Sequence, residues 1–260
     1  MRALIAGLLA TLLASAAFAA DEGACYVAST PVHADFALAQ VAAAIGHKQL
    51  TVVVIGSASS SLPGVEGAAK AYPARFEESL KRRLSGVAVK VVAHTKARET
   101  AAEMAKSLQQ VLVDDKPDLV VWQTGTVDAM LGIDPEDFQH AIDQGVETLR
   151  AGKSDAILMN MQYSPRTDSM IALGSYVDAM RFVALQREVP LFDRLAVMKN
   201  WNEMGVFDFY SANKRIDFAE KVHDCIGRLL GRLVVEGADL SQSVNTGSGP
   251  PELNHNRDSH

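Results

Sequence analysis

Short apolar stretches rich in β-branched residues recur along the chain, separated by longer stretches of mixed polarity. Each apolar stretch is short enough to be a strand, and a strand that is apolar on both faces is typical of a buried parallel sheet. These stretches lie at residues 50–55, 87–92, 119–122, 156–161 and 189–192. The pattern therefore predicts five buried strands.

The segments between these strands have the period of amphipathic helices, with apolar residues three or four positions apart. In residues 68–84, for example, Tyr72, Phe76 and Leu80 fall on one helical face. The other predicted helices lie at residues 101–112, 138–149, 169–185 and 216–235. Because strands and helices alternate, we expect parallel strands joined by right-handed crossovers. The predicted fold class is α/β: a three-layer α/β/α sandwich with a five-stranded parallel sheet.

The first residues have the composition of a secretory signal peptide. A basic residue at position 2, an apolar run over residues 4–13 and the ending Ala17-Phe18-Ala19 match its three regions. A retained membrane anchor is the alternative, but a spanning helix needs about 20 apolar residues, and acidic residues follow directly. We therefore expect a periplasmic or secreted protein with no stable membrane span after removal of the signal.

The remaining length suits a single well-buried domain. From about residue 239 the composition turns to Ser, Gly, Asn, Pro and His, which cannot bury enough apolar area to become ordered. We predict a signal peptide at residues 1–19, one domain at residues 20–238 and a disordered tail at residues 239–260.

Charge and cysteines restrict the partners and the compartment. The formal net charge is -6, without a long run of Lys or Arg, so we expect a small-molecule or glycan ligand and no nucleic acid. The two cysteines are Cys25 and Cys225, and an oxidising compartment allows them to form a disulfide. Closing a loop of about 200 residues is worth roughly 4 to 5 kcal/mol in the chain-entropy model. Two buried thiols are the alternative.

In an open parallel sheet, the ligand crevice lies at the carboxyl ends of the strands. The first predicted strand ends in Gly56 and Ser57, followed by Ser59 and two further serines. Small hydroxyl residues on such a turn suit a nucleophile or an anion cradle. Capping of the following helix is the alternative role for these serines.

The loop after the third strand carries a more specific motif. Its Gly-Thr-Val-Asp sequence at residues 125–128 resembles the Gly-x-Asn-Asp block of the SGNH (GDSL-like) hydrolases. The Gly-Ser turn at residues 56–57 and the order of elements over residues 50–235 are similar to that superfamily, and residues 161–166 resemble a loop of an exported bacterial subgroup. The resemblance implies a flavodoxin-like SGNH hydrolase fold and ester-hydrolase chemistry.

Members of that superfamily use a serine nucleophile after the first strand, oxyanion donors from a Gly and an Asn, and a base from a late Asp-x-x-His. With Gly56 in the position of the glycine of Gly-Asp-Ser, Ser57 takes the Asp position and Ala58 the nucleophile position. Ser59 then follows one residue late. Thr95 stands where the second block has its glycine.

The later blocks also depart from the family pattern. Val127 occupies the position of the donor Asn, and Ser211, three residues after Asp208, occupies that of the base His. Valine has no side-chain donor, and loss of one oxyanion donor costs about 3 to 4 kcal/mol of transition-state stabilisation. The Ser, Gly, Asn and His positions are thus all replaced. Gly125 and Asp128 match the block, and we expect Asp128 to brace the loop.

Further candidates for ligand binding are His94 at the end of the second strand and Arg166 after the fourth. An ion pair with Asp168 or Asp128 is the alternative role for Arg166. Asp208 and Ser211 complete the candidate ligand-binding set. The remaining histidines show no metal-ligand spacing, so we predict neither a metal nor a cofactor.

We therefore expect an SGNH-hydrolase-like envelope protein that binds a glycan or acyl ligand and whose catalytic positions are replaced. The alternative is an active periplasmic esterase or deacetylase that uses Ser57 or Ser59 with a non-standard base, for which His223 is a candidate. A helix beginning near Asn213 would place His223 about 15 Å along its axis from the crevice, so we expect it to pack instead. A third class, an assembly partner, predicts a large apolar surface patch.

Overall fold

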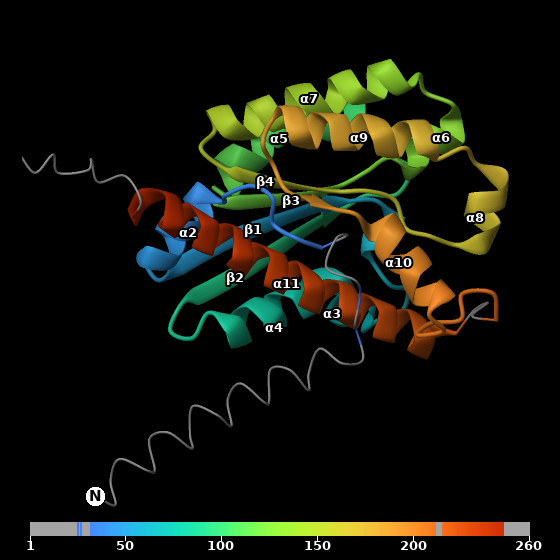
Figure 1. Ribbon diagram of the computed structural model, residues 1–260, viewed down its shortest axis with the longest axis horizontal. Coiled ribbons are helices and arrows are strands. Elements are labelled where there is room, and N and C mark those ends of the chain that lie inside the picture. The colour runs from blue at the N-terminus through green and yellow to red at the C-terminus, as the bar shows by residue number, and fades with distance from the viewer. Residues whose placement is uncertain (1–24, 26, 28–31, 212–214, 247–260) are drawn as a thin grey trace, which may run out of the picture.

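Five parallel strands form the central sheet of the computed structural model, which describes residues 25, 27, 32–211 and 215–246 (Figure 1). The predicted signal peptide lies outside the described residues. The strands are β1 (Gln49–Gly56), β2 (Ala88–Thr95), β3 (Leu119–Gln123), β4 (Asp155–Met159) and β5 (Leu191–Phe192). Their order in the sheet is β2-β1-β3-β4-β5. Because the order reverses between β1 and β3, the carboxyl ends of these two strands flank the expected crevice.

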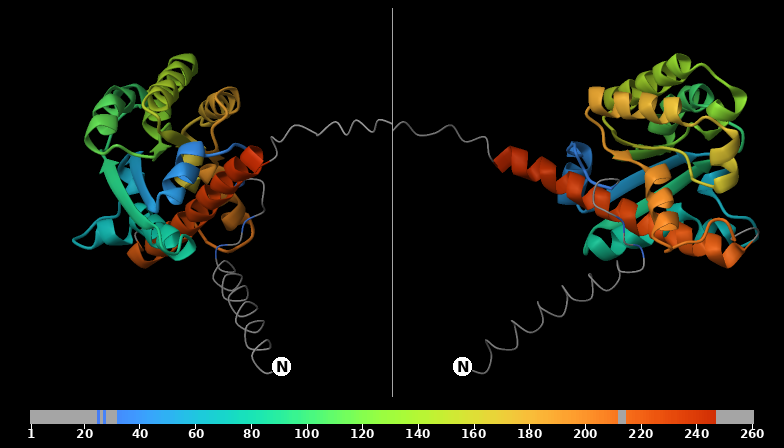
Figure 2. Two further views of the ribbon diagram at one scale, coloured as in Figure 1. Left: turned by 90° about the vertical axis from the view of Figure 1, so that its left-hand side faces the viewer. Right: turned by 45° about the vertical axis from the view of Figure 1, so that its right-hand side comes forward.

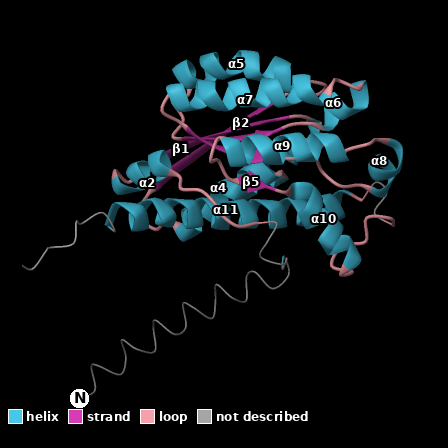
Figure 3. Ribbon diagram, turned by 45° about the horizontal axis from the view of Figure 1, so that its top comes forward, coloured by secondary structure: helices cyan, strands magenta, loops and turns pink. Residues whose placement is uncertain are grey.

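Helices cover both faces of the sheet, which confirms the predicted three-layer α/β/α sandwich (Figures 2 and 3). One layer consists of α5 (Ala101–Asp114), α7 (Pro135–Ala151) and α9 (Gly174–Gln186). The opposite layer consists of α2 (Ala39–Gly46), α4 (Tyr72–Arg83) and α11 (Ile216–Thr246). Every residue of β3 is buried, as expected for a strand covered on both faces.

Short helices follow the carboxyl ends of the strands, and several of them lie at the right of Figure 1. They are η2 (Ala58–Ser60), α3 (Gly67–Lys70), α6 (Thr126–Leu131), α8 (Pro165–Met170) and α10 (Arg194–Glu203). These helices follow β1, β3, β4 and β5 closely in sequence, so the residues that begin them line the edge at which ligands bind in this architecture.

The long helix α11 packs closely along α4. A Cβ on Gly227 would lie 2.7 Å from the backbone of Arg75, so this helix crossing requires glycine. The predicted disulfide is confirmed: Cys225 of α11 is bonded to Cys25, with their Cα atoms 5.2 Å apart. The helix continues to Thr246, past the boundary expected at residue 238. Its later turns pack on α2, where Leu38 N–H donates to the Gly237 carbonyl at 2.9 Å.

Among the helices of the described residues, none has the length and apolar character needed to span a bilayer. The same part of the chain contains no group of three or more His, Cys, Asp or Glu side chains placed to hold a metal ion.

Candidate functional site

The turn after β1 is organised around one side-chain amide. Gln123, the last residue of β3, is fully buried and points its Oε1 at this turn. That oxygen lies within hydrogen-bonding distance of the Ser57 N–H at 3.2 Å, the Ser59 Oγ at 3.1 Å and the Ser60 Oγ at 2.9 Å. The Ser57 Oγ lies 3.3 Å from the same oxygen. The serine hydroxyls therefore converge on the carbonyl oxygen of an amide.

This arrangement depends on Gly56. A Cβ at that position would lie 2.1 Å from the Ser60 Oγ and 3.2 Å from the Gln123 Oε1. Any larger residue would push the turn off the end of β3. Ser60 also shares a hydrogen bond of 2.9 Å with the Tyr72 hydroxyl, which ties the turn to the first residue of α4.

No described histidine hydrogen-bonds to a described serine. His223 accepts from the Tyr72 N–H, His94 pairs with Asp115, and His140 bonds to Gln144. Ser57 and Ser59, the candidate nucleophiles, are thus brought together at the turn, and among the described residues no imidazole is hydrogen-bonded to either of them.

The other crevice positions lie close to this turn in the fold. Thr95 is paired with Gly56 in the β1–β2 register and is exposed. Gly125 precedes α6, and Val127 lies in its first turn. Asp128 is buried and accepts from the Ala101 N–H at 2.9 Å, so it fixes the start of α5 to the loop after β3. Burial raises the pKa of the Asp128 carboxyl.

Four candidate ligand-binding residues are not brought into the crevice. The His94 Nε2 lies 2.7 Å from the Asp115 Oδ2, on the edge strand, and the side chain is half exposed. Asp208 accepts from the N–H groups of Tyr210 and Ser211 within its own turn. A hydrogen bond from the Ser211 side chain, together with these N–H groups, holds the pKa of the Asp208 carboxyl below its usual range.

Arg166 is exposed on α8. The ion pair proposed for it does not form, because Asp168 pairs with Lys199 at 2.7 Å and Asp128 accepts from Ala101. The guanidinium of Arg166 therefore has no ion-pair partner among the described residues, and it lies outside the cavity described next.

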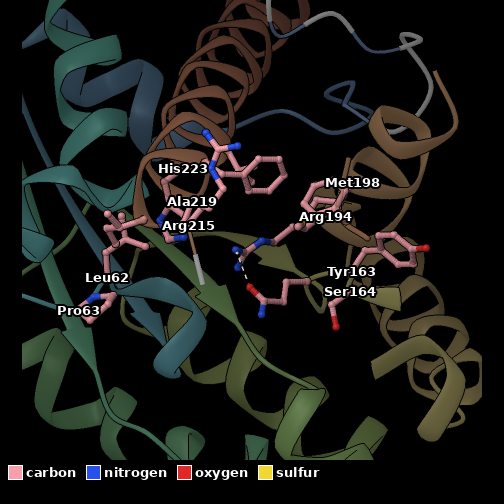
Figure 4. Close-up of a pocket in the computed structure, with 14 residues that line it drawn as sticks. Leu62, Pro63, Tyr163, Ser164, Arg194, Met198, Arg215, Ala219 and His223 are labelled. Atoms are coloured by element: carbon pink, nitrogen blue, oxygen red, sulfur yellow. Dashed lines mark hydrogen bonds between the residues drawn. The ribbon is translucent and has the colours of Figure 1, made fainter. Parts of the chain in front are cut away.

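A cavity of about 390 Å³ lies beside the serine turn, between the loop after β4 and the first turns of α11 (Figure 4). Its walls are mostly apolar. The apolar residues that line it are Leu62, Pro63, Met198, Phe209, Ile216, Phe218, Ala219 and Val222. Phe209 and Phe218 are packed edge to face, with ring centroids 5.3 Å apart.

Arg194, the first residue of α10, lines this cavity and is fully buried. Its guanidinium donates from both terminal nitrogens to the Ser59 carbonyl at 3.2 Å and from Nη2 to the Gln162 Oε1 at 3.3 Å. It also lies over the Tyr72 ring, 5.5 Å from the centroid. No described carboxylate pairs with it, and its Nε–H has no acceptor. Burial lowers the pKa of Arg194 to about 10, so the group is charged at neutral pH.

His223 lines the same cavity from α11. Its Nδ1 accepts from the Tyr72 N–H at 2.9 Å, so the proton of the neutral ring is on Nε2. Burial, and secondarily the charge of Arg194, lowers the pKa of His223 to about 3. The imidazole is therefore a neutral donor at the pH of most compartments.

The family model of the Non-GDSL lipase-like family matches residues 24–240. The chain belongs to the Non-GDSL lipase-like family. A search of curated proteins finds no match to it.

Solved structures with 20% sequence identity or less share the fold of this Non-GDSL lipase-like protein. TesA is 20% identical with a TM-score of 0.55, and the alignment covers 70% of this chain and 99% of TesA. A catalytic mutant of the acetylxylan esterase Axe2 from Geobacillus stearothermophilus is 15% identical with a TM-score of 0.56, covering 71% and 94%. A lipase/acylhydrolase from Enterococcus faecalis is 18% identical with a TM-score of 0.52, covering 70% and 94%. These structures confirm the predicted fold, and together with the family match they support the predicted resemblance to the SGNH (GDSL-like) hydrolases.

Sequence reasoning did not select Arg194 as a site residue of this Non-GDSL lipase-like protein, and it did not place His223 in this cavity. Arg194 directly follows Asp193 at the carboxyl end of β5, and the rule that ligands bind at strand ends would have selected it. His223 was considered as a base but placed away from the crevice. The sequence carries no signal that the first turns of α11 lie against the start of α4.

Proposed function

We propose that this protein is an exported SGNH-hydrolase-like protein that binds a ligand at the carboxyl edge of its sheet, with its ester-hydrolysis machinery replaced. The observation that carries the proposal is the position of the Gln123 amide oxygen, on which the hydroxyls of Ser57, Ser59 and Ser60 converge. In a serine hydrolase, a base stands in that relation to the nucleophile.

An amide oxygen accepts a hydrogen bond but cannot take up a proton at neutral pH, so it does not activate a serine. His223 offers no substitute, because its Nδ1 is occupied by the Tyr72 N–H and its pKa is lowered to about 3. A base with so low a pKa has almost no tendency to hold the proton of a hydroxyl. Val127, at the position of the oxyanion-donor Asn, adds no side-chain donor.

Two observations support export. The first 19 residues read as a signal peptide, and the disulfide between Cys25 and Cys225 fits an oxidising compartment. Secretion of the full chain with cleavage after Ala19, read by mass spectrometry of the mature protein, tests this part of the proposal. Retention of the uncleaved chain in the cytoplasm would contradict it.

Hydrolysis is tested with the purified mature protein on p-nitrophenyl acetate, p-nitrophenyl butyrate and acetylated xylooligosaccharides. We expect no turnover above that of Ser57→Ala and Ser59→Ala variants. The matched control is Ser61→Ala, because the Ser61 hydroxyl donates to the Ala58 carbonyl outside the Gln123 cluster. Turnover that disappears in Ser57→Ala or Ser59→Ala but persists in Ser61→Ala would establish an active serine esterase instead.

A further inference from the structure

A positive charge that has no counter-ion in the described part of the chain is buried beside the cavity. Arg194 is fully buried, and its acceptors, the Ser59 carbonyl and the Gln162 amide oxygen, are both neutral. Burying an arginine without a carboxylate is costly, and such residues are normally paired with an anion. The guanidinium therefore lacks one partner that its chemistry calls for. It borders the cavity but is inaccessible to solvent, so a ligand there reaches it only when a neighbouring side chain such as Gln162 moves aside.

The cavity supplies a second donor but no acid. The Nε2–H of His223 has no acceptor among the described residues, and the ring is on the cavity wall. Arg215 also lines the cavity, but its guanidinium is paired with Asp217 at 2.8 Å. Among the described residues, no Asp or Glu lines the cavity. An anion would therefore meet two sets of donors and no repelling carboxylate.

The remaining wall selects for an apolar tail. The cavity wall is formed mainly by aromatic and aliphatic side chains, among them Phe209, Phe218, Val222 and Met198. A volume of about 390 Å³ is near the lower end for small-molecule sites. Such a space suits an aliphatic chain of medium length, and a highly hydroxylated sugar would leave most of its polar groups unpaired there.

We propose that this cavity binds a medium-chain aliphatic carboxylate, with its carboxylate on Arg194 and His223 and its chain along the apolar wall. The side chain of Gln162 is then displaced, since its neutral amide oxygen occupies a position on the guanidinium that a carboxylate holds more strongly. This ligand class is the one that the proposed binding function would use, so the assignment rests on that function.

The probes are sodium octanoate, octanol and acetate, titrated into the mature protein by isothermal calorimetry. Octanol lacks the charge and acetate lacks the tail. We expect octanoate to bind at least about tenfold more tightly than either, because both the charge-assisted hydrogen bonds and the apolar burial are then satisfied. Equal affinity for octanoate and octanol would overturn the role of Arg194, and no octanoate binding would overturn the inference as a whole.

Two variants locate the site. Gln162→Glu places a carboxylate on the protein beside Arg194, and we expect it to weaken octanoate binding by about tenfold or more through occupation of the guanidinium and repulsion of the ligand. Arg194→Gln removes the charge and is expected to reduce octanoate to the affinity of octanol. The matched control is Lys221→Gln, which removes an exposed cation on α11, the helix of His223, outside this cavity. Thermal melting checks the folding of each variant, and Gln162→Glu keeps the test decisive if Arg194→Gln does not fold.

The octanoate titration and the hydrolysis assay can fail independently of each other. Serine-dependent turnover would end the proposed function whatever octanoate does. Absence of octanoate binding in a protein without turnover would end only the assignment of the ligand. Octanoate affinity unchanged in Gln162→Glu would place any binding elsewhere and contradict the proposed site.

Discussion

The buried His223 should make the stability of the protein depend on pH in a defined way. The neutral ring accepts the Tyr72 N–H, and protonation of Nδ1 would break that hydrogen bond inside the protein. In the unfolded chain the pKa returns to its ordinary value near 6.5, whereas in the folded protein it is lowered to about 3. The unfolded state therefore binds a proton between these two values, and the folded state does not.

The sign and size of the change in stability with pH follow from the difference between these two pKa values. The contribution of His223 to stability is complete above pH 6.5, and it is lost progressively as the pH falls toward 3. Linkage gives a loss of about 2 kcal/mol at pH 5 and about 3 kcal/mol at pH 4, relative to neutral pH. Solvent screens this loss of stability little, because the His223 side chain is only 5% exposed.

The comparison uses His223→Asn, whose side-chain oxygen can accept the Tyr72 N–H but which does not titrate. Urea unfolding at a series of pH values gives the free energy of unfolding of both proteins. We expect wild type to lose about 2 kcal/mol relative to the variant between pH 7.5 and pH 5. The control His47→Asn removes an exposed histidine and should leave the pH profile unchanged. A constant difference between wild type and His223→Asn across this range would refute the reasoning.

Three other changes test neighbouring parts of the fold. Gln123→Leu removes the acceptor of the serine turn and should destabilise the protein by about 1 to 3 kcal/mol in urea unfolding; a neutral effect would mean that the turn does not depend on that amide. Burial raises the pKa of Asp155 to about 6, so the folded state holds its proton at a higher pH than the unfolded state. Wild type should therefore gain about 1 kcal/mol relative to Asp155→Asn as the pH falls from 7 to 5, and a loss would contradict this sign. Replacing Cys25 and Cys225 together by serine should cost roughly 4 to 5 kcal/mol; a loss under about 1 kcal/mol would show that the reduced chain is equally constrained.

The sheet could be predicted because each strand carries its own apolar run, which can be recognised without knowing how distant elements pack. Residues 119–122 are apolar at every position, as expected for a strand that is covered on both faces. The order of elements then implied parallel crossovers, and the observed topology agrees. In an open parallel sheet the ligand crevice lies at the carboxyl ends of the strands. The sequence alone was therefore enough to select the turn at Gly56 and the loop at Gly125.

The cavity could not be predicted because it depends on how distant elements pack. The prediction that His223 lies away from the crevice assumed that α11 runs away from the edge of the sheet. Instead, its first turns lie against the start of α4, where Tyr72 meets His223. Sequence patterns also assign arginine to the surface, so the burial of Arg194 is visible only in the fold. The helical continuation to Thr246 was missed because polar composition was given more weight than packing: Ala238 and Ser241 are buried.

The most direct test of the central claim is covalent labelling of the mature protein with a fluorophosphonate, which reacts with activated serines. Because the hydroxyls of Ser57 and Ser59 are directed at the Gln123 amide oxygen, we expect no adduct on either residue after prolonged incubation at neutral pH. Mass spectrometry of the digested protein reads the result at each serine. Stoichiometric modification of Ser57 or Ser59 would show that the serine is activated and that the hydrolytic machinery is intact.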